Sequence, residues 1–131
     1  CAQSVLYAFC DDLQIEKDFA LKIASGFGGG MGLKEDVCGA VTGGIIVIGA
    51  KYGRGENEDH AEAKITAYTK TRELIDQFAV QHGTFICREL LGGCDFTTVE
   101  GRKEFKEKDL FNKVCKGCVQ DVVNILETIT T

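Results

Sequence analysis

The chain has 131 residues, the length of one ordinary domain. Its 15 Lys and Arg residues against 20 Asp and Glu residues give a net charge of −5. Because binding to a phosphate backbone requires a basic patch, this balance disfavours nucleic-acid binding. The hydrophobic fraction of 44% is enough for a core and excludes a disordered chain. Proline is absent, and there are seven cysteines.

The cysteines fall below the density of a short disulfide scaffold, which is about 8–10%. Their odd number leaves at least one thiol unpaired within the chain. We therefore expect a reducing, cytoplasmic setting in which the cysteines serve ligation or exchange chemistry. No signal-peptide pattern is visible at the first residues. The longest apolar run, residues 37–50, is shorter than the roughly 20 residues that span a bilayer, so we expect no membrane insertion.

Apolar residues at helical spacing predict helices over residues 2–13 and 15–27. The glycine-rich run 25–32 ends the second helix, because glycines permit positive φ. Residues 37–53 form the most apolar segment, and small residues at its start indicate close approach of another backbone. Its run 45–48 is also compatible with a buried strand. We favour a helix because no second strand candidate exists to pair with it.

A turn over residues 53–57 leads into a long helix, with Asn57 as the expected N-cap and Glu58 and Asp59 in the first turn. We expect the helix to end at Gly83 and its apolar face to consist of Ala61, Ile65, Tyr68, Ile75, Phe78 and Ala79. A short helix is expected over 84–91 and a last one over 109–129, whereas residues 94–108 are polar and show no clear pattern. The sequence thus predicts one all-α domain, residues 1–131, built as a compact bundle of about five to six helices with a glycine-rich loop.

Several candidate motifs are incomplete. The glycine run matches neither the P-loop nor the dinucleotide fingerprint, so we expect a tight loop rather than a phosphate site. His60 and His82 lack the i, i+4 partner of a helical metal site and are expected to be exposed at the ends of the long helix. The acidic run 56–59 lacks the spacing of a calcium loop.

Cys115 and Cys118 form a CxxC motif. No His follows it, which excludes c-type haem attachment, and no βαβ unit precedes it as in thioredoxin-like sites. On a helix these two residues share a face, so both sulfurs could point to one ligand. A free cysteine can also pack as a small hydrophobic side chain. We favour packing for Cys10 but not for Cys38, which opens the glycine-rich helix.

Five sequence blocks carry a resemblance to a known family: residues 1–6, 26–32, 38–43, 87–92 and 114–115. In this order they resemble the redox-active proteins named for the pattern C_GCAxxG_C_C, and they cover essentially the whole chain. The resemblance puts the signature cysteines at Cys1, Cys38, Cys87 and Cys115. Cys10 and Cys118 then look accessory, and Cys94 is undecided. The resemblance extends to a domain of split-Soret cytochromes, whose cysteines look like an iron–sulfur site.

The resemblance implies an oxidoreductase or electron carrier in which the four signature cysteines converge on one site, with an iron–sulfur cluster as the first expectation. The glycines Gly28, Gly29, Gly30 and Gly39 would bring backbone N–H groups toward the cofactor.

Two alternatives stay open. In the first, no metal is bound and Cys38 and Cys87 are redox thiols, their pKa lowered by a helix N-terminus and by Arg88 respectively. In the second, structural zinc holds the helices of an interaction domain together. A redox partner protein is expected for either redox reading, and a homo-oligomer is left open.

Overall fold

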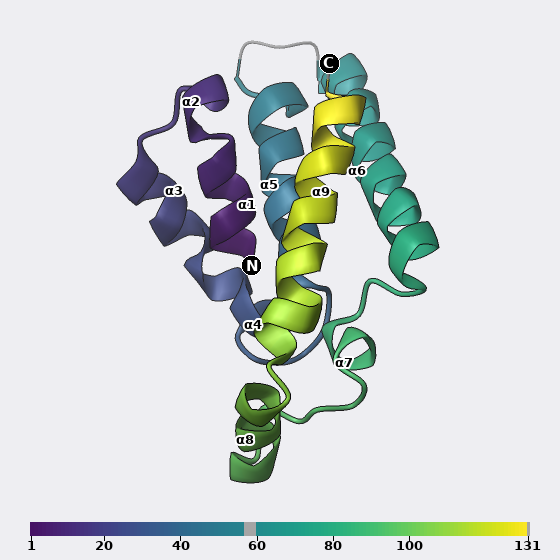
Figure 1. The fold of residues 1–131 in the computed structure, drawn as a ribbon. Helices are drawn as coiled ribbons and strands as arrows, with labels where there is room; N and C mark the ends of the chain where they lie inside the picture. Colours follow the sequence, from purple (N-terminus) through teal and green to yellow (C-terminus); the bar gives the residue numbers. More distant parts are fainter. Residues whose placement is uncertain (57–59, 131) are drawn as a thin grey trace.

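The computed structural model describes residues 1–56 and 60–130 (Figure 1). Within them the chain forms helices and no sheet, which confirms the all-α prediction. Six helices span seven residues or more, as expected for the bundle: α1 (Ala2–Ala8), α3 (Lys17–Ala24), α5 (Gly39–Tyr52), α6 (His60–His82), α8 (Val99–Glu107) and α9 (Lys116–Ile129). The shorter elements are α2 (Cys10–Leu13), the 3₁₀ turn η1 (Ser25–Phe27), α4 (Gly28–Met31), α7 (Cys87–Leu90) and the π-helical turn η2 (Phe111–Cys115).

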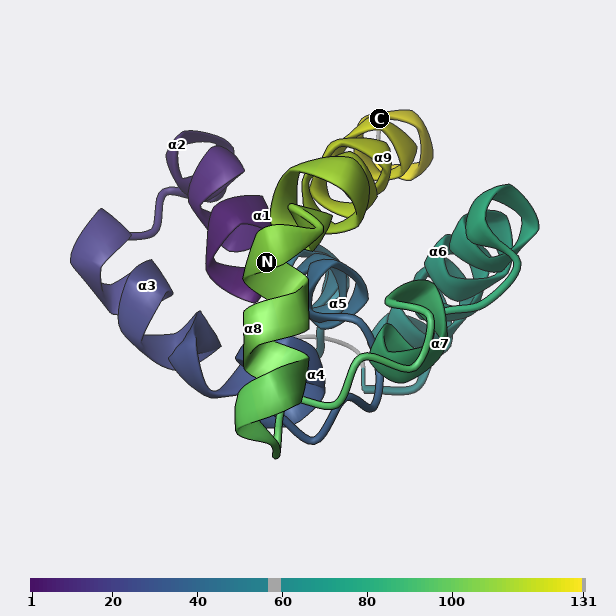
Figure 2. The ribbon, with the colours of Figure 1, turned by 60° about the horizontal axis from the view of Figure 1, so that its bottom comes forward.

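Helix α5 is the centre of the bundle and packs against α1, α6 and α9 (Figures 1 and 2). This confirms the choice of helix over strand for this segment. Val41, Val47 and Ile48 of α5 are buried in the main core, where they meet apolar residues from the surrounding helices. The core thus forms around a helix that is hydrophobic on nearly every side, as expected of a fully buried helix.

Glycines on α5 let its neighbours come unusually close. A Cβ on Gly43 would lie 2.7 Å from the carbonyl oxygen of Ala2 in α1, and a Cβ on Gly44 would lie 2.7 Å from Leu74 Cδ2 in α6. A larger residue at Gly43 would push α1 away from α5, because the backbone of Ala2 is too close for a real carbon contact. At Gly44 the side chains of Leu74 and Val122 would have to shift. The predicted close approach of another backbone to this segment is confirmed.

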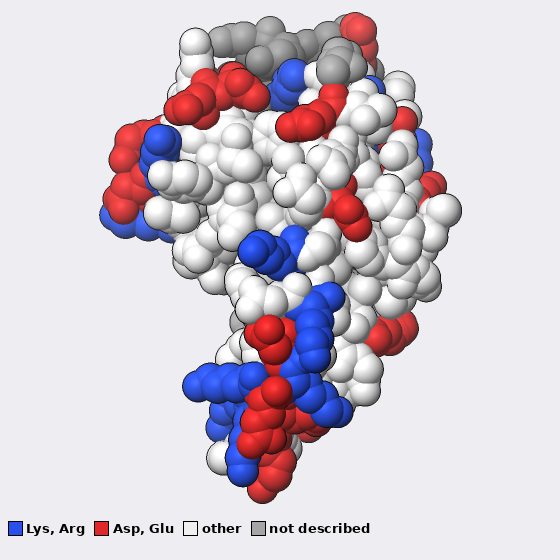
Figure 3. All heavy atoms as spheres, in the orientation of Figure 1, with Lys and Arg blue, Asp and Glu red and all other residues white. Residues whose placement is uncertain are grey.

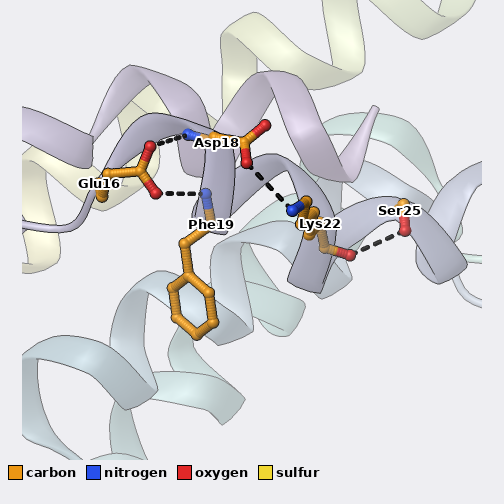
Figure 4. A network of polar contacts seen from close by, with 5 residues as sticks. All are labelled: Glu16, Asp18, Phe19, Lys22 and Ser25. Carbon is orange, nitrogen blue, oxygen red and sulfur yellow. Dashed lines mark hydrogen bonds and ion pairs between the residues drawn. The ribbon is translucent and has the colours of Figure 1, made fainter.

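Helix α3 begins and ends with local polar contacts (Figure 4). The Glu16 carboxylate accepts hydrogen bonds from the backbone N–H groups of Asp18 and Phe19 at 3.1 and 3.0 Å, which caps the first turn. At the other end the Ser25 hydroxyl donates to the carbonyl of Lys22 at 2.8 Å. Glu16 and Ser25 therefore set the length of α3, and the chain turns through η1 into the glycine-rich segment.

The face of α6 that meets the core differs from the predicted one. Leu74 and Phe78 are buried, whereas Ile65 and Tyr68 are 66% and 57% exposed. With 3.6 residues per turn, Ala63 and Ala67 share the side of Leu74, and Ile65 lies on the opposite side. Ala63 and Ala67 are partly buried, whereas Ala61 is exposed as well, so the prediction was wrong for Ala61, Ile65 and Tyr68.

His82 is not the exposed helix-end residue that the sequence suggested. Its Nε2 lies 2.8 Å from Asp121 Oδ2 of α9, its ring stacks on Phe78 with centroids 4.4 Å apart, and its side chain is only 20% exposed. His82 therefore connects α6 to α9. His60 is exposed as expected.

Other boundaries also shift. The predicted helix 2–13 is interrupted at Phe9, which separates α1 from α2, and α8 forms within the polar segment for which no helix was predicted. The expected N-cap Asn57, with Glu58 and Asp59, lies outside the described residues. In the part of the chain that is described, no helix has the length and apolar character needed to cross a membrane.

Candidate functional site

A pocket of about 350 Å³ is lined by residues of α4, α7, α8 and the start of α9. These elements lie at one end of the bundle (Figures 1 and 2). Its walls are almost entirely apolar, apart from thiols and two basic side chains. Five of the seven cysteines line it: Cys1, Cys38, Cys87, Cys115 and Cys118. The pocket therefore brings together the four signature cysteines and adds Cys118.

A backbone clamp holds Cys38 beside Cys87. Val37 and Ile86 form an isolated antiparallel bridge. On either side of it, the Cys38 N–H donates to the carbonyl of Phe85 at 2.8 Å and the Cys87 N–H donates to the carbonyl of Asp36 at 2.6 Å. Because side chains alternate along extended backbone, Cys38 and Cys87 leave the bridge on the same side. Two distant segments thus deliver their thiols to one wall of the pocket.

Cys1 reaches the pocket through the close packing of α1 on α5. A Cβ on Gly39 would lie 3.0 Å from Cys1 Cβ and 3.2 Å from the carbonyl oxygen of Phe27. Glycine at this first position of α5 leaves room for Cys1 next to Cys38. Gly39 therefore does serve the site, but by making space for a cysteine.

Cys115 and Cys118 come from the junction between η2 and α9. Cys115 is the last residue of the π-helical turn, and Cys118 lies three residues later, on the same face of the continuing helix. Both sulfurs border the pocket, as the shared face of the CxxC motif predicted. Cys118 is 1% exposed and belongs to the main core. It also lines the pocket. π-helical turns of this kind are frequent at functional sites.

Cys38 has a lower pKa than an ordinary thiol. The Cys118 thiol donates a hydrogen bond to it, and the backbone N–H groups of Ala40 and Val41 at the start of α5 add to the effect. Together they outweigh burial and lower the pKa of Cys38 from about 9 to about 7. The same hydrogen bond, together with burial, raises the pKa of Cys118, because its proton is held between the two sulfurs. The pair therefore begins to lose its first proton near neutral pH and keeps the second.

The expected low pKa at Cys87 was wrong. Burial and the negative charge of Cys38 raise the pKa of Cys87 to about 12. Arg88 does not offset this, because its exposed guanidinium turns toward the carbonyl of Lys34, 3.4 Å away. Burial, followed by the charge of Cys38, also raises the pKa of Cys115. The negative charge of Cys38 thus raises the pKa values of both Cys87 and Cys115.

The two remaining cysteines do not line the pocket. Cys10 is buried in the main core, where its thiol donates to the carbonyl of Leu6 at 3.4 Å, which agrees with the packing role expected for it. Cys94 belongs to a smaller apolar cluster together with Cys87 and Phe96, and its thiol donates to the carbonyl of Gly101 at 2.9 Å. Cys94 thus fixes the loop before α8.

The glycine-rich segment forms one edge of the pocket. Residues 29–33 all have positive φ, including the non-glycine residues Met31 and Leu33. L-residues adopt this conformation at a cost of about 1–2 kcal/mol each. A Cβ on Gly30 would lie 2.8 Å from Cys87 Cβ. Gly29 and Gly30 line the pocket, Gly28 does not, and the segment functions as the predicted tight loop.

A buried carboxylate that the sequence did not reveal ties this edge to the loop before α8. Glu35 is 2% exposed, and its Oε1 accepts a hydrogen bond from the N–H of Phe96 at 2.8 Å. Its Oε2 has no hydrogen-bond partner in the described chain. The backbone of Glu35 also accepts from the N–H of Arg88 at 3.1 Å. No motif marks such a residue, because its partners come from distant segments.

Among the described residues, no three His, Cys, Asp or Glu side chains are arranged to hold a metal ion. Cys1, Cys38, Cys87 and Cys115 thus share the pocket without forming a ligand set in this arrangement of side chains. The pair in hydrogen-bond contact is Cys38 and Cys118.

Comparison with known proteins identifies the family. The protein-family model described as "Putative redox-active protein (C_GCAxxG_C_C)" matches residues 1–129 of the chain. The chain belongs to this family. No curated protein and no solved structure matches it. Membership in the C_GCAxxG_C_C family confirms the resemblance seen in the sequence and agrees with a redox role for the cysteine pocket.

Proposed function

We propose that the pocket is a dithiol–disulfide site in which Cys38 is the nucleophile and Cys118 the resolving thiol. The observation that carries this proposal is the hydrogen bond from the Cys118 thiol to Cys38 within a pocket of the redox-active family. The thiolate is the reactive form of cysteine, and Cys38 is the pocket thiol that ionises near neutral pH. Cys38 and Cys118 line the same pocket, which places them where a disulfide bond of about 2.05 Å can form after their side chains turn toward each other.

The reaction uses an external disulfide as the oxidant. The Cys38 thiolate attacks one sulfur of that disulfide, which forms a mixed disulfide and releases the other sulfur as a thiolate. Cys118 then gives up its proton and attacks the Cys38 sulfur, which releases the second half of the oxidant. The products are the Cys38–Cys118 disulfide, one thiol and one thiolate, so two electrons and one proton pass from the pair to the oxidant. The reverse sequence reduces a disulfide.

The test is to identify the disulfide. We expect mild oxidation of the reduced protein to lower its mass by two hydrogens, and peptide mapping to find a Cys38–Cys118 bridge that dithiothreitol reverses. Cys38→Ser and Cys118→Ser should each abolish this bridge. Cys10→Ser is the matched control, because Cys10 is buried but does not line the pocket. A reversible bridge that joins other cysteines, or none, would overturn the proposal.

A cysteine-ligated cluster is the second candidate, favoured by the gathering of five thiols in one apolar pocket. Thiolates select iron–sulfur clusters or zinc over hard cations. Cys1, Cys38, Cys87 and Cys115 would hold such a group after their side chains rotate toward one another, and it would supply one-electron transfer. We expect anaerobically isolated protein to carry iron and acid-labile sulfide that Cys1→Ser removes. Zinc alone would support the structural alternative, and metal-free protein would leave the dithiol site.

A further inference from the structure

Apart from the thiolate of Cys38 at the pocket wall, the charged side chains that line the pocket are both basic. Arg102 and Lys106 of α8 border it, and no Asp or Glu among the described residues does. This contrasts with the chain as a whole, whose net charge is −5. A positive rim on a negative protein favours the entry of an anion, because low-dielectric walls strengthen the local field.

Arg102 and Lys106 have no acidic side chain paired with them among the described residues. Elsewhere on α8 and just beyond it, Lys103 lies 3.6 Å from Glu107 and Lys108 lies 2.7 Å from Glu104. Figure 3 shows this mixture of basic and acidic side chains over α8. Within the described residues neither Arg102 nor Lys106 forms an ion pair, and the Arg102 guanidinium donates only to the carbonyl of Phe96 at 2.7 Å. The paired lysines are the ones that do not line the pocket.

The rest of the pocket suits an apolar body. Leu33 and Phe111 both line it, and each is 52% exposed, so both apolar side chains are open to an incoming molecule. The volume of about 350 Å³ lies within the range of small-molecule sites. Leu33 stands on the strained glycine segment and Phe111 opens the π-helical turn, so both are held by unusual backbone.

We infer that the pocket binds a small organic anion with an apolar body, whose negative group meets Arg102 and Lys106 and whose body meets Leu33 and Phe111. Anion binding itself does not require the proposed dithiol function, but the choice of oxidant described next rests on it. A disulfide made of apolar, carboxylate-bearing halves would be the preferred oxidant of Cys38.

Binding is tested on the reduced protein with 2-naphthoate and its neutral analogue 2-naphthamide, by calorimetry or NMR titration. We expect naphthoate to bind more tightly, and the double variant R102Q/K106Q to weaken naphthoate about tenfold while leaving naphthamide unchanged. Lys103→Gln is the matched control, because Lys103 lies on the same helix but does not line the pocket. Phe111→Ser should weaken both ligands. Equal binding of both ligands, or a loss that K103Q reproduces, would overturn the inference.

Oxidant preference is tested by the rate at which Cys38 is modified, followed by mass spectrometry of its peptide. The anionic 5,5′-dithiobis(2-nitrobenzoate) should lose about tenfold in rate in R102Q/K106Q, and the neutral 4,4′-dithiodipyridine should not. If both reagents yield the Cys38–Cys118 bridge without this difference, the dithiol function stands and the anion preference falls. If naphthoate binds as expected but no bridge forms, the anion site stands and the dithiol function falls.

Discussion

The thiol of Cys118 donates a hydrogen bond to the sulfur of Cys38 across the pocket, joining α9 to the N-terminus of α5. This contact makes the pair share one proton, which explains why one thiol becomes more acidic while its partner becomes less so. A pair in this state holds its nucleophile and its resolving group together before any oxidant arrives.

The first prediction concerns the pH dependence of alkylation at Cys38. Because its pKa is about 7, the thiolate fraction and the rate with iodoacetamide should rise between about pH 6 and 8 and then level off. Cys118→Ala removes the donor and should move the midpoint upward by about one to two pH units. Cys118→Ser keeps a hydroxyl donor and should stay closer to the wild type. A wild-type midpoint near pH 9 would contradict the prediction.

The second prediction ranks the pocket thiols. At pH 7.5 Cys38 should react with iodoacetamide at least about tenfold faster than Cys87, because burial and the Cys38 charge raise the pKa of Cys87 to about 12. Cys38→Ser removes that charge and should lower the pKa of Cys87, so Cys87 should react faster in this variant. Peptide mapping over time measures both rates. Prior labelling of Cys87 in the wild type would refute the ranking.

The third prediction compares two glycines of α5. Gly43→Ala should lower the free energy of unfolding by about 1–3 kcal/mol, because the new Cβ would press on the backbone of Ala2. Gly49 lies on the same helix, and a Cβ there would meet nothing within 4 Å. Gly49→Ala should therefore raise the free energy of unfolding by about 0.5–1 kcal/mol. Urea unfolding of both variants gives the comparison. Equal effects would argue against the close packing of α1 on α5.

The fourth prediction compares two glycines of the strained loop. Gly30 and Gly32 both have positive φ, so alanine costs about 1–2 kcal/mol of backbone strain at either position. Gly30→Ala would also press on the backbone N of Asp36 and on Cys87, whereas Gly32→Ala has open space. Gly30→Ala should therefore be the more destabilising and should alter the reactivity of Cys87. If Gly32→Ala proves equally costly, the loop does not pack as described.

The central helix could be predicted because its evidence is local. Residues 37–53 combine a long apolar run with glycines and lack any partner strand, and they form α5 with small residues at its contacts. Helix α8 escaped prediction because Phe105 is its one large apolar side chain that packs on a core cluster. Its N-cap is a single hydrogen bond, in which the Thr98 hydroxyl accepts from the Gly101 N–H. A surface helix with so narrow an apolar face leaves little periodic signal.

The sequence indicated which cysteines gather in the pocket, but it did not indicate their pKa values. Sequence blocks single out Cys1, Cys38, Cys87 and Cys115, and all four line the pocket. Cys118 gained its importance from a contact with another helix, which the spacing of the CxxC motif does not encode. The pKa of Cys87 likewise depends on burial and on a distant thiolate rather than on the adjacent Arg88. The role of Cys118 and the pKa of Cys87 both depend on residues that are distant in the sequence, so no local pattern could have predicted them.

The backbone clamp between the segments around Val37 and Ile86 allows the arrangement of the thiols to be followed through backbone amide exchange. The amides of Cys38 and Cys87 are themselves the hydrogen-bond donors on either side of the bridge. Their exchange with deuterium is therefore slow only while the two segments remain together. The integrity of the thiol arrangement can thus be read from two amide protons, in protein that carries no label and no substitution.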